Sequence, residues 1–229
     1  MGLRRLCCIL ALVLVGFVAR AQTGAYFCTS PGALLRYERV AAFTGKPWWV
    51  HTEKIDLVRP VSGGCEVTVT SDIKSDSGKS PIKAPFTSTV VVRADGTVVV
   101  DVAKAAEEAA KQMFSAFDFK SSGGVSLLPS SLEPGDTLPD IHAVVSWGGV
   151  KMTIDYDNRV VLRRETLTVP AGTYDCLVVQ EHKLERAPFH RRERITLTWY
   201  TPGIGMVRHE TSFPDSRPET VEKLVSIKR

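Results

Sequence analysis

The chain has 229 residues, of which 44% are hydrophobic and 24% charged, and this ordinary globular composition excludes wholesale disorder. The first 21 residues contain three of the 29 basic residues and no acidic one, so 26 basic residues face 25 acidic ones in the rest of the chain. A chain so near to neutrality lacks the basic face of a dedicated nucleic-acid binder, and we expect no nucleic acid as a partner.

Residues 1–21 have the pattern of a cleaved secretory signal peptide. A basic head precedes an unbroken apolar run, Leu6–Val18, and small residues precede the expected cut before Gln22. Cys7 and Cys8 stand at the start of this run, whereas a lipidated cysteine would follow its end. No later apolar run reaches the length of a transmembrane helix, so we expect a chain that does not span the membrane. We predict export to the periplasm or the extracellular space.

Three cysteines follow the leader, and an oxidising compartment allows one pair to close. Among the possible pairings we favour Cys28 with Cys65, because that bridge would tie down a terminal segment. The alternative is that both, together with Cys176, are buried thiols.

The first half of the chain predicts β-strands interrupted by one helix. The strands are expected at residues 33–43, 48–58, 65–73, 87–93 and 97–102. Apolar residues then recur at helical spacing over residues 103–117, with Asp101 as the N-cap and Glu107 placed to pair with Lys111. We expect Phe114 and Phe117 of this stripe to plug the interior of the sheet.

Residues 120–140 are rich in glycine, proline and serine, which is typical of a surface crossover loop. Neither a charge run nor a low-complexity tract supports a domain boundary there. We therefore expect residues 22–229 to form one β-rich domain.

Past Asp140 the side chains alternate between apolar and polar, and turn residues separate the runs. Seven strands are expected, at residues 141–147, 150–156, 159–169, 173–184, 191–201, 206–213 and 220–228. The predicted fold is mainly β (α+β): a long curved antiparallel meander sheet or half-barrel, with one helix packed on its concave face.

Three sequence motifs in the second half stand out in combination: Leu138-Pro139-Asp140, then 168–176 (TVPAGTYDC), then 199–208 (WYTPGIGMVR). With them the chain resembles the TapB-like proteins, secreted bacterial domains of unknown function, over about residues 129–228 and more loosely at 32–37. The resemblance implies a curled antiparallel sheet and no active site. It also implies an envelope protein partner, namely a tetratricopeptide-repeat protein. The proline and glycine residues of the motifs are expected to form corners.

The densest charge feature surrounds the expected hairpin tip at residues 187–189. It consists of Arg186, His190, Arg191, Arg192 and Arg194. Arginine side chains suit phosphate or carboxylate groups, so this cluster is a candidate site for an anionic ligand or partner. The alternative is a solvated hairpin end, moderated by neighbouring glutamates.

The sequence offers residues for two kinds of catalytic site. A thiol enzyme would use Cys176 as nucleophile, with a histidine as base taken from His142, His182, His190 and His209. A metal site would join Glu181-His182 to His209-Glu210. No local signature supports either, and we expect Cys176 to serve packing, with no catalytic residue, metal or cofactor.

The last feature is a set of large apolar groups that could line or fill the interior: Trp48, Trp49, Trp147 and Trp199. The leading hypothesis is a non-enzymatic envelope module that binds or scaffolds a protein partner or an apolar ligand. The alternatives are a periplasmic carrier of lipid or lipoprotein, which needs a continuous apolar cavity, and a thiol or metal-dependent hydrolase.

Overall fold

The computed structural model describes residues 24–75, 82–114 and 116–229, so the expected signal peptide lies outside the described residues. In the described part of the chain the strands are β1 (Leu34–Ala41), β2 (Pro47–Val61), β3 (Gly64–Ser75), β4 (Phe86–Arg93), β5 (Val98–Asp101), β6 (Lys120–Gly123), β7 (Val125–Leu128), β8 (Ile141–Trp147), β9 (Val150–Val169), β10 (Gly172–Ala187), β11 (His190–Thr201), β12 (Gly205–Ser212) and β13 (Pro218–Lys228), and the helix is α1 (Val102–Met113). This confirms the predicted class, a mainly β chain with a single helix in the residues described.

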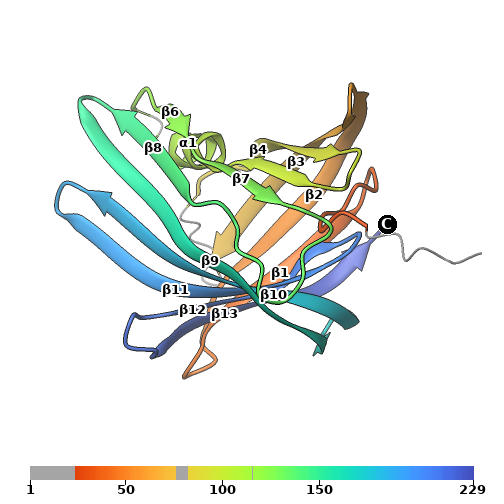
Figure 1. Ribbon diagram of the computed structural model, residues 1–229. Coiled ribbons are helices and arrows are strands. Elements are labelled where there is room, and N and C mark those ends of the chain that lie inside the picture. Colours follow the sequence, from red (N-terminus) through yellow and green to blue (C-terminus); the bar gives the residue numbers. More distant parts are fainter. Residues whose placement is uncertain (1–23, 76–81, 115) are drawn as a thin grey trace, which may run out of the picture.

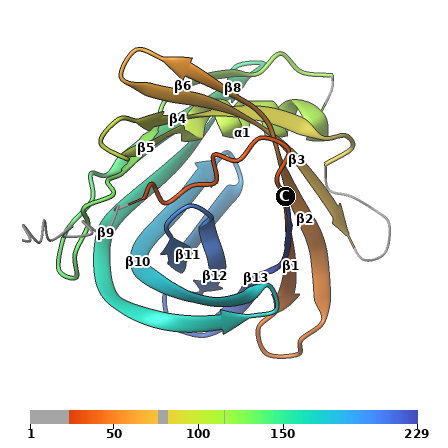
Figure 2. The ribbon, with the colours of Figure 1, turned by 90° about the vertical axis from the view of Figure 1, so that its right-hand side faces the viewer.

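The strands form one antiparallel sheet in the order β6-β8-β9-β10-β11-β12-β13-β1-β2-β3-β4-β5-β7 (Figure 1). The sheet curls so far that it nearly closes into a barrel, as Figure 2 shows. The predicted meander accounts for most neighbours, because consecutive strands of a meander pair through short turns.

The two edges of this sheet are β6 and β7, which are consecutive along the chain and separated only by Gly124. β6 pairs with β8 at one edge, and β7 pairs with β5 at the other. The segment 120–128, which we call the closing segment, therefore joins the two edges and completes the ring. Residues 120–128 had been expected in a surface loop; their backbone groups are instead used by two partners.

Glycine is required where the closing segment passes from one edge to the other. Gly123 and Gly124 have φ angles of 69° and 78°, which side chains disfavour. A Cβ on Gly123 would lie 2.6 Å from the His142 carbonyl oxygen, and one on Gly124 would lie 2.5 Å from the Ala143 Cβ. Both distances are below van der Waals contact, so β8 approaches the segment only because these positions lack side chains.

The helix α1 packs across this closure, against β4 on one side and β6 and β8 on the other. Asp101 caps it as predicted, since its carboxylate accepts a hydrogen bond from the Lys104 backbone N–H at 2.8 Å. Within the part of the chain that the structure describes, no helix has the length and apolar content that a membrane crossing would require.

Glu107 is a buried acid that attaches the helix to the closing segment. Its carboxylate accepts from the Nζ of Lys104 at 2.7 Å, the Nζ of Lys111 at 2.6 Å and the hydroxyl of Ser121 on β6 at 2.5 Å. Burial alone would raise its pKa, but these three donors outweigh burial and lower the pKa to about 2. The predicted Glu107–Lys111 pair is thus confirmed, and it belongs to a larger network.

The expected plug of Phe114 and Phe117 is wrong. The helix ends at Met113, and the two phenylalanines are 52% and 51% exposed, since the chain turns back there toward β6. The segment 24–33 crosses the opening of the ring at its other end (Figure 2). It is held there by the Gly203 N–H, which donates to the Ala25 carbonyl at 2.8 Å, and by burial of Tyr26.

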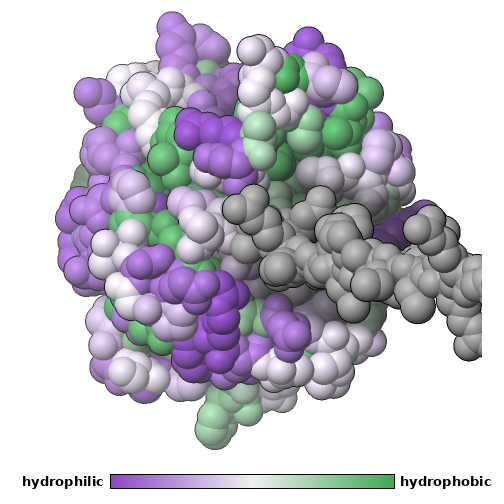
Figure 3. Space-filling model, turned by 45° about the vertical axis from the view of Figure 1, so that its right-hand side comes forward, coloured by the Kyte–Doolittle hydropathy of each residue, from purple (hydrophilic) through white to green (hydrophobic). Residues whose placement is uncertain are grey.

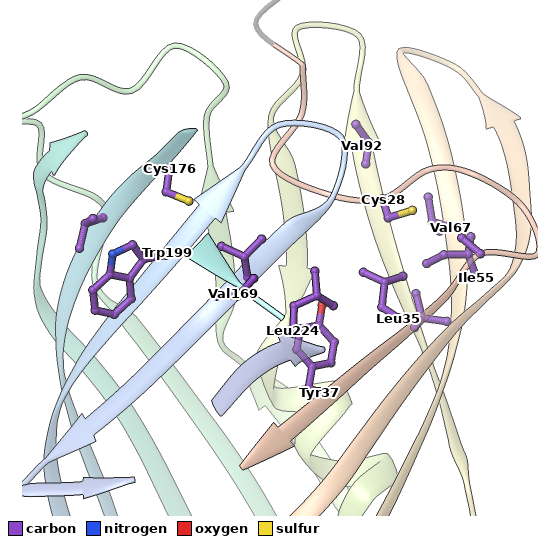
Figure 4. Close-up of a cluster of buried hydrophobic side chains, with 14 residues drawn as sticks. Cys28, Leu35, Tyr37, Ile55, Val67, Val92, Val169, Cys176, Trp199 and Leu224 are labelled. Carbon is purple, nitrogen blue, oxygen red and sulfur yellow. The ribbon is translucent and has the colours of Figure 1, made fainter. Parts of the chain in front are cut away.

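The largest buried cluster lies beneath this segment, where the ends of β9 and β10 fold toward β13 and the Ala171 N–H donates to the Leu224 carbonyl at 3.3 Å. Figure 4 shows Tyr37 and Leu224 between two groups of side chains from opposite walls. The cluster consists of Cys28, Ala33, Leu35, Tyr37, Ile55, Val67, Val69, Val92, Val169, Cys176, Val178, Trp199, Val207 and Leu224. Apolar burial of this kind is the main favourable term for the fold.

Six strands, rather than the expected seven, follow Asp140, because β9 continues through the expected turn at residues 157–158. Asn158 has a φ of 49°, and the pairing of β9 with β10 shifts register between Gln180 and His182. Asparagine tolerates this conformation, so the strand bends at a bulge without ending.

Replacing Gly124 by alanine should destabilise the protein more than the same change at Gly63. The φ angles are nearly equal, 78° and 79°, but nothing lies within 4 Å of a Cβ at Gly63. We expect a loss of about 1 kcal/mol for Gly63→Ala from backbone strain, and about 2–4 kcal/mol for Gly124→Ala from strain plus overpacking. Urea denaturation of both variants measures the difference, and equal losses would contradict the closure described above.

Candidate functional site

A cavity of about 120 Å³ lies inside the curl of the sheet, and most of its chemical groups are cationic or hydroxyl-bearing. We call it the cationic cavity. Its lining comes from β1, β9, β10, β11 and β12: Arg39, Tyr156, Lys183, Glu185, Arg192, Arg194, Thr196, His209 and Thr211. β9 to β12 are consecutive in the sheet and β1 is separated from β12 only by β13, so the lining comes from one continuous wall of the barrel.

Strand alternation explains why these residues meet. Positions 183 and 185 of β10 share one face, as do 192, 194 and 196 of β11. The register places Lys183 opposite Arg194 and Glu185 opposite Arg192. Four basic side chains are thereby brought into one lining with a single carboxylate.

The cations are largely paired, but one positive charge is left in excess. The Nζ of Lys183 lies 2.7 Å from Glu185, and Glu219 of β13 binds Arg192 at 3.1 Å and Arg194 at 2.7 Å. Arg39 pairs with Glu222. Four cations thus face three carboxylates, Glu185, Glu219 and Glu222, around the cavity. Burial works against the charge on Lys183, but Tyr156 and Glu185 outweigh it, so its pKa is raised and it stays protonated.

The carboxylates are held ionised. Hydrogen bonds from Arg194 and Arg192 lower the pKa of Glu219 to about 2, although burial opposes this. Burial also opposes charge on Glu222, but contact with His51, 3.5 Å away, and with Arg39 lowers its pKa to about 2. Glu219 and Glu222 are therefore ionised at neutral pH.

His209 is the neutral member of the lining. Burial, with a further contribution from Arg39, lowers its pKa to about 4. Its Nδ1 lies 2.9 Å from the Thr198 hydroxyl, which supplies a hydrogen-bond partner. His209 thus lies on the concave side of the sheet.

A second cavity of about 180 Å³ lies under the segment 24–33. Its lining is mixed: Tyr26, Tyr37, Val98, Leu128 and Tyr200 lie with Glu53, Arg159 and Glu181. Arg159 is buried and pairs with Glu181 at 2.7 Å. Charged groups therefore line both interior cavities, and neither is the continuous apolar cavity of a few hundred Å³ that a lipid carrier requires.

The predicted anion cluster is divided between the two faces of the sheet. Only Arg192 and Arg194 line the cationic cavity. On the other face Arg186 pairs with Asp155 at 2.9 Å and Arg191 with Glu193 at 2.6 Å. His190, at the start of β11, lies 3.9 Å from Glu185. The two faces separate because successive residues of a strand point to opposite sides.

Cys176 is placed as a packing residue. It is buried in the cluster with Val178 and Trp199, and burial, with the nearby charges of Glu165 and Asp175, raises its pKa to about 11. Its thiol lies 3.5 Å from the Tyr174 carbonyl oxygen. A thiol with this pKa is scarcely ionised at neutral pH, which is the opposite of what a nucleophile needs.

The residues weighed for a metal site are not brought together. Glu181 pairs with Arg159 inside, whereas His182 lies on the other face, 2.7 Å from Asp157 and 2.9 Å from Glu193. Among the described residues no group of three or more histidine, cysteine or acidic side chains is arranged to hold a metal ion.

The cysteines at 28, 65 and 176 are free thiols. Cys65 packs against the cluster that contains Cys28, so the two residues share one region of the core. Their pairing stays a prediction.

The sequence analysis did not predict the charged side chains that face the barrel interior outside the predicted anion cluster. They include Arg39, Lys183 and Glu222. One signal was present: on β13 the alternation that buries Leu224 also buries Glu222 and Thr220. A charged residue in phase with a buried apolar one indicates an interior ion pair.

The chain is similar to proteins of one family and shares its fold with two solved structures. The family model for DUF3108-like proteins matches residues 42–216. Two solved structures share the fold, each with a TM-score of 0.73 over 90% of this chain. One, from Bacteroides fragilis, is described as an exported protein with a YmcC-like fold, is 20% identical and is covered over 100% of its length. The other, from Parabacteroides distasonis, is described as a lipoprotein, is 17% identical and is covered over 99%. No match is found among curated proteins.

Acid should destabilise the protein through His209. The unfolded chain binds a proton at this residue below pH 6.5, but the folded chain binds it only below about pH 4, so folding stability falls as pH falls through this interval. Replacing His209 by asparagine should remove up to about 3 kcal/mol of this pH dependence, which urea denaturation between pH 4.5 and 6.5 measures. Glu219 and Glu222, with lowered pKa values, lose their contributions below this window. His51 and His182, whose pKa values are raised, lose theirs above it. An unchanged pH slope in the variant would show that His209 titrates normally.

Proposed function

We propose that this chain, which belongs to the DUF3108-like family, is an exported, non-enzymatic binding protein. Its barrel interior holds a small ligand with a carboxylate or phosphate group. The observation that carries the proposal is the cationic cavity, about 120 Å³ in volume, with four basic side chains against three carboxylates. Export is supported by the leader pattern of the sequence and by the descriptions of the two structural neighbours.

The cavity suits an oxyanion better than a neutral or cationic ligand. Arg192 and Arg194 are oriented by Glu219, and Lys183 by Glu185, so their donors are positioned before a ligand arrives. Thr196, Thr211 and the phenol of Tyr156 add hydroxyl groups to the lining. The charge in excess favours one further negative group, and charge-assisted hydrogen bonds are the strongest available to bind it.

A non-enzymatic role is supported by the absence of activated groups in the described part of the chain. Cys176, the candidate nucleophile, is buried with a raised pKa, and His209 has a hydroxyl partner and no thiol. Most of the charges beside the cavity are held in ion pairs, which is typical of binding and structure and not of acid–base catalysis.

The finer part of the proposal is a TapB-like role with a tetratricopeptide-repeat protein as partner. Its support is the motif set at 168–176 and 199–208, which forms the hairpin ends around Val169, Cys176 and Trp199. Native pull-down from the envelope, with mass spectrometry of proteins and lipids, tests it. Recovery of a repeat protein supports this role, and recovery of other partners alone excludes it.

Substitutions of two neighbouring arginines on opposite faces of β11, Arg192 and Arg191, test the oxyanion site. Inorganic phosphate and acetate, at constant ionic strength, serve as probes in isothermal titration calorimetry. We expect Arg192→Gln to weaken binding about tenfold, because it removes a charged donor from the cavity, and Arg191→Gln to leave binding unchanged. Equal effects of the two substitutions, or no saturable binding to the unmodified protein, would contradict the proposal.

A further inference from the structure

Four turns lie together at one end of the barrel. They join β1 to β2, β8 to β9, β10 to β11 and β12 to β13, and in an antiparallel sheet alternate turns fall at the same end. Three of them line the left side of Figure 1, and the β1–β2 turn is its lowest point. We call this end the turn rim; residues 113–114 and 116–120, between α1 and β6, belong to it because β6 begins there beside Ser146 of β8. Lys83 lies beside them, since its backbone N–H donates to the Gln112 carbonyl at 3.3 Å.

Exposed hydrophobic side chains gather at the turn rim. Of the eight large ones that are exposed in the described residues, five lie there: Phe43, Met113, Phe114, Phe117 and Phe189. Phe43 and Phe189, at the tips of two turns, are 96% and 110% exposed. The lowest point of Figure 3 is accordingly a hydrophobic projection. The described turns at the opposite end, residues 62–63, 94–97, 170–171 and 202–204, expose no such group.

Phe189 is also held in a disfavoured backbone conformation. Its φ is 62°, in the left-handed region where glycine and asparagine are the usual residues. A fully exposed aromatic ring gains nothing from the fold that would offset this cost. Strain at a solvent-exposed tip therefore indicates a role for the ring outside the folded chain.

Most charged side chains at the turn rim that lack an ion-pair partner are positive. Lys46, Lys83, Lys120 and Lys151 are exposed and make no ion pair with any described residue. The acids near the rim are engaged: Asp215 binds Arg217, Glu193 binds Arg191 and His182, and Glu219 binds Arg192 and Arg194. Asp118 is the exception. The rim thus combines free cations with projecting aromatic rings.

A surface groove of about 520 Å³ runs along the same rim. It is bordered by Phe117 and Trp147, and its charged residues are Lys120, Lys151 and Asp118, so the groove has one net positive charge. Such a groove offers apolar walls for a hydrocarbon chain and cations for the phosphate attached to it.

We propose that the turn rim docks onto a lipid surface that carries anionic phospholipid headgroups. The projecting rings stand on separate turns with charged residues between them, so they form no continuous patch of the kind that a protein interface requires. A fluid bilayer interface accepts separate aromatic side chains, and its phosphates complement the free lysines. The proposal does not depend on the oxyanion site.

The test is co-sedimentation of the exported protein with vesicles of phosphatidylglycerol mixed into phosphatidylcholine, and with vesicles of phosphatidylcholine alone. The protein should bind the anionic vesicles more tightly, and salt should weaken that binding. The double variant Phe43→Ser with Phe189→Asn should lose at least about tenfold in partition coefficient. Asparagine relieves the left-handed strain at position 189, so a loss of folding is not expected to accompany the loss of binding.

The matched control is Leu57→Ser with Leu162→Ser, which removes two side chains that are 54% and 38% exposed on β2 and β9. It should bind vesicles as the unmodified protein does. Lys46→Gln with Lys151→Gln should bind both kinds of vesicle equally weakly. Equal losses in the phenylalanine and leucine variants, failure of the unmodified protein to bind vesicles, or self-association through the rim would each overturn the proposal.

Discussion

The pairing of a single segment with both edges of the sheet is the constraint on which this structure depends. A curved sheet leaves two edge strands with unpaired backbone groups, which invite aggregation. Here both edge strands, β6 and β7, are only four residues long and belong to one segment, which passes from one edge to the other through Gly123 and Gly124. The closure tolerates no Cβ at the crossing, and α1 covers the opening beside it through the buried carboxylate of Glu107.

Closure also decides what the interior contains. Strands from opposite walls face one another across a narrow space, so an inward side chain is either packed or paired. Near the segment 24–33 the interior is filled by apolar side chains around Tyr37 and Leu224. Toward the turn rim it is filled by ion pairs of Arg39, Arg192 and Arg194. The barrel is thus apolar at one end and cationic at the other, and its cationic cavity and turn rim lie at the same end.

The sequence predicts the walls of this barrel well and its closure poorly. From β8 to β13, alternation and turn residues act locally, so strand positions follow from short windows of sequence. Asn158 misled the prediction because a residue that favours turns also suits a bulge, and only the long partner strand β10 decides between them. The closing segment was read as a loop because its glycines serve a contact with Ala143 that is distant in sequence.

Only part of the cationic cavity could be predicted, again because its residues meet through pairing of strands. Arg192 and Arg194 were recognised as a possible anion site, but strand direction divides them from Arg186 and Arg191, whose spacing along the chain is similar. Arg39 and Glu222 belong to β1 and β13, which come from opposite ends of the chain and pair in the middle of the sheet. Pairing across strands that are far apart in sequence was therefore beyond a reading of local patterns.

Native-state amide hydrogen exchange tests the closure most directly. If β6 and β7 hold the ring together, their paired amides should exchange only through global unfolding, with the same free energy of opening as Leu177 and Val179 of β10, which are buried. Exchange of these amides through a local opening of much lower free energy, as at a frayed sheet edge, would contradict the account.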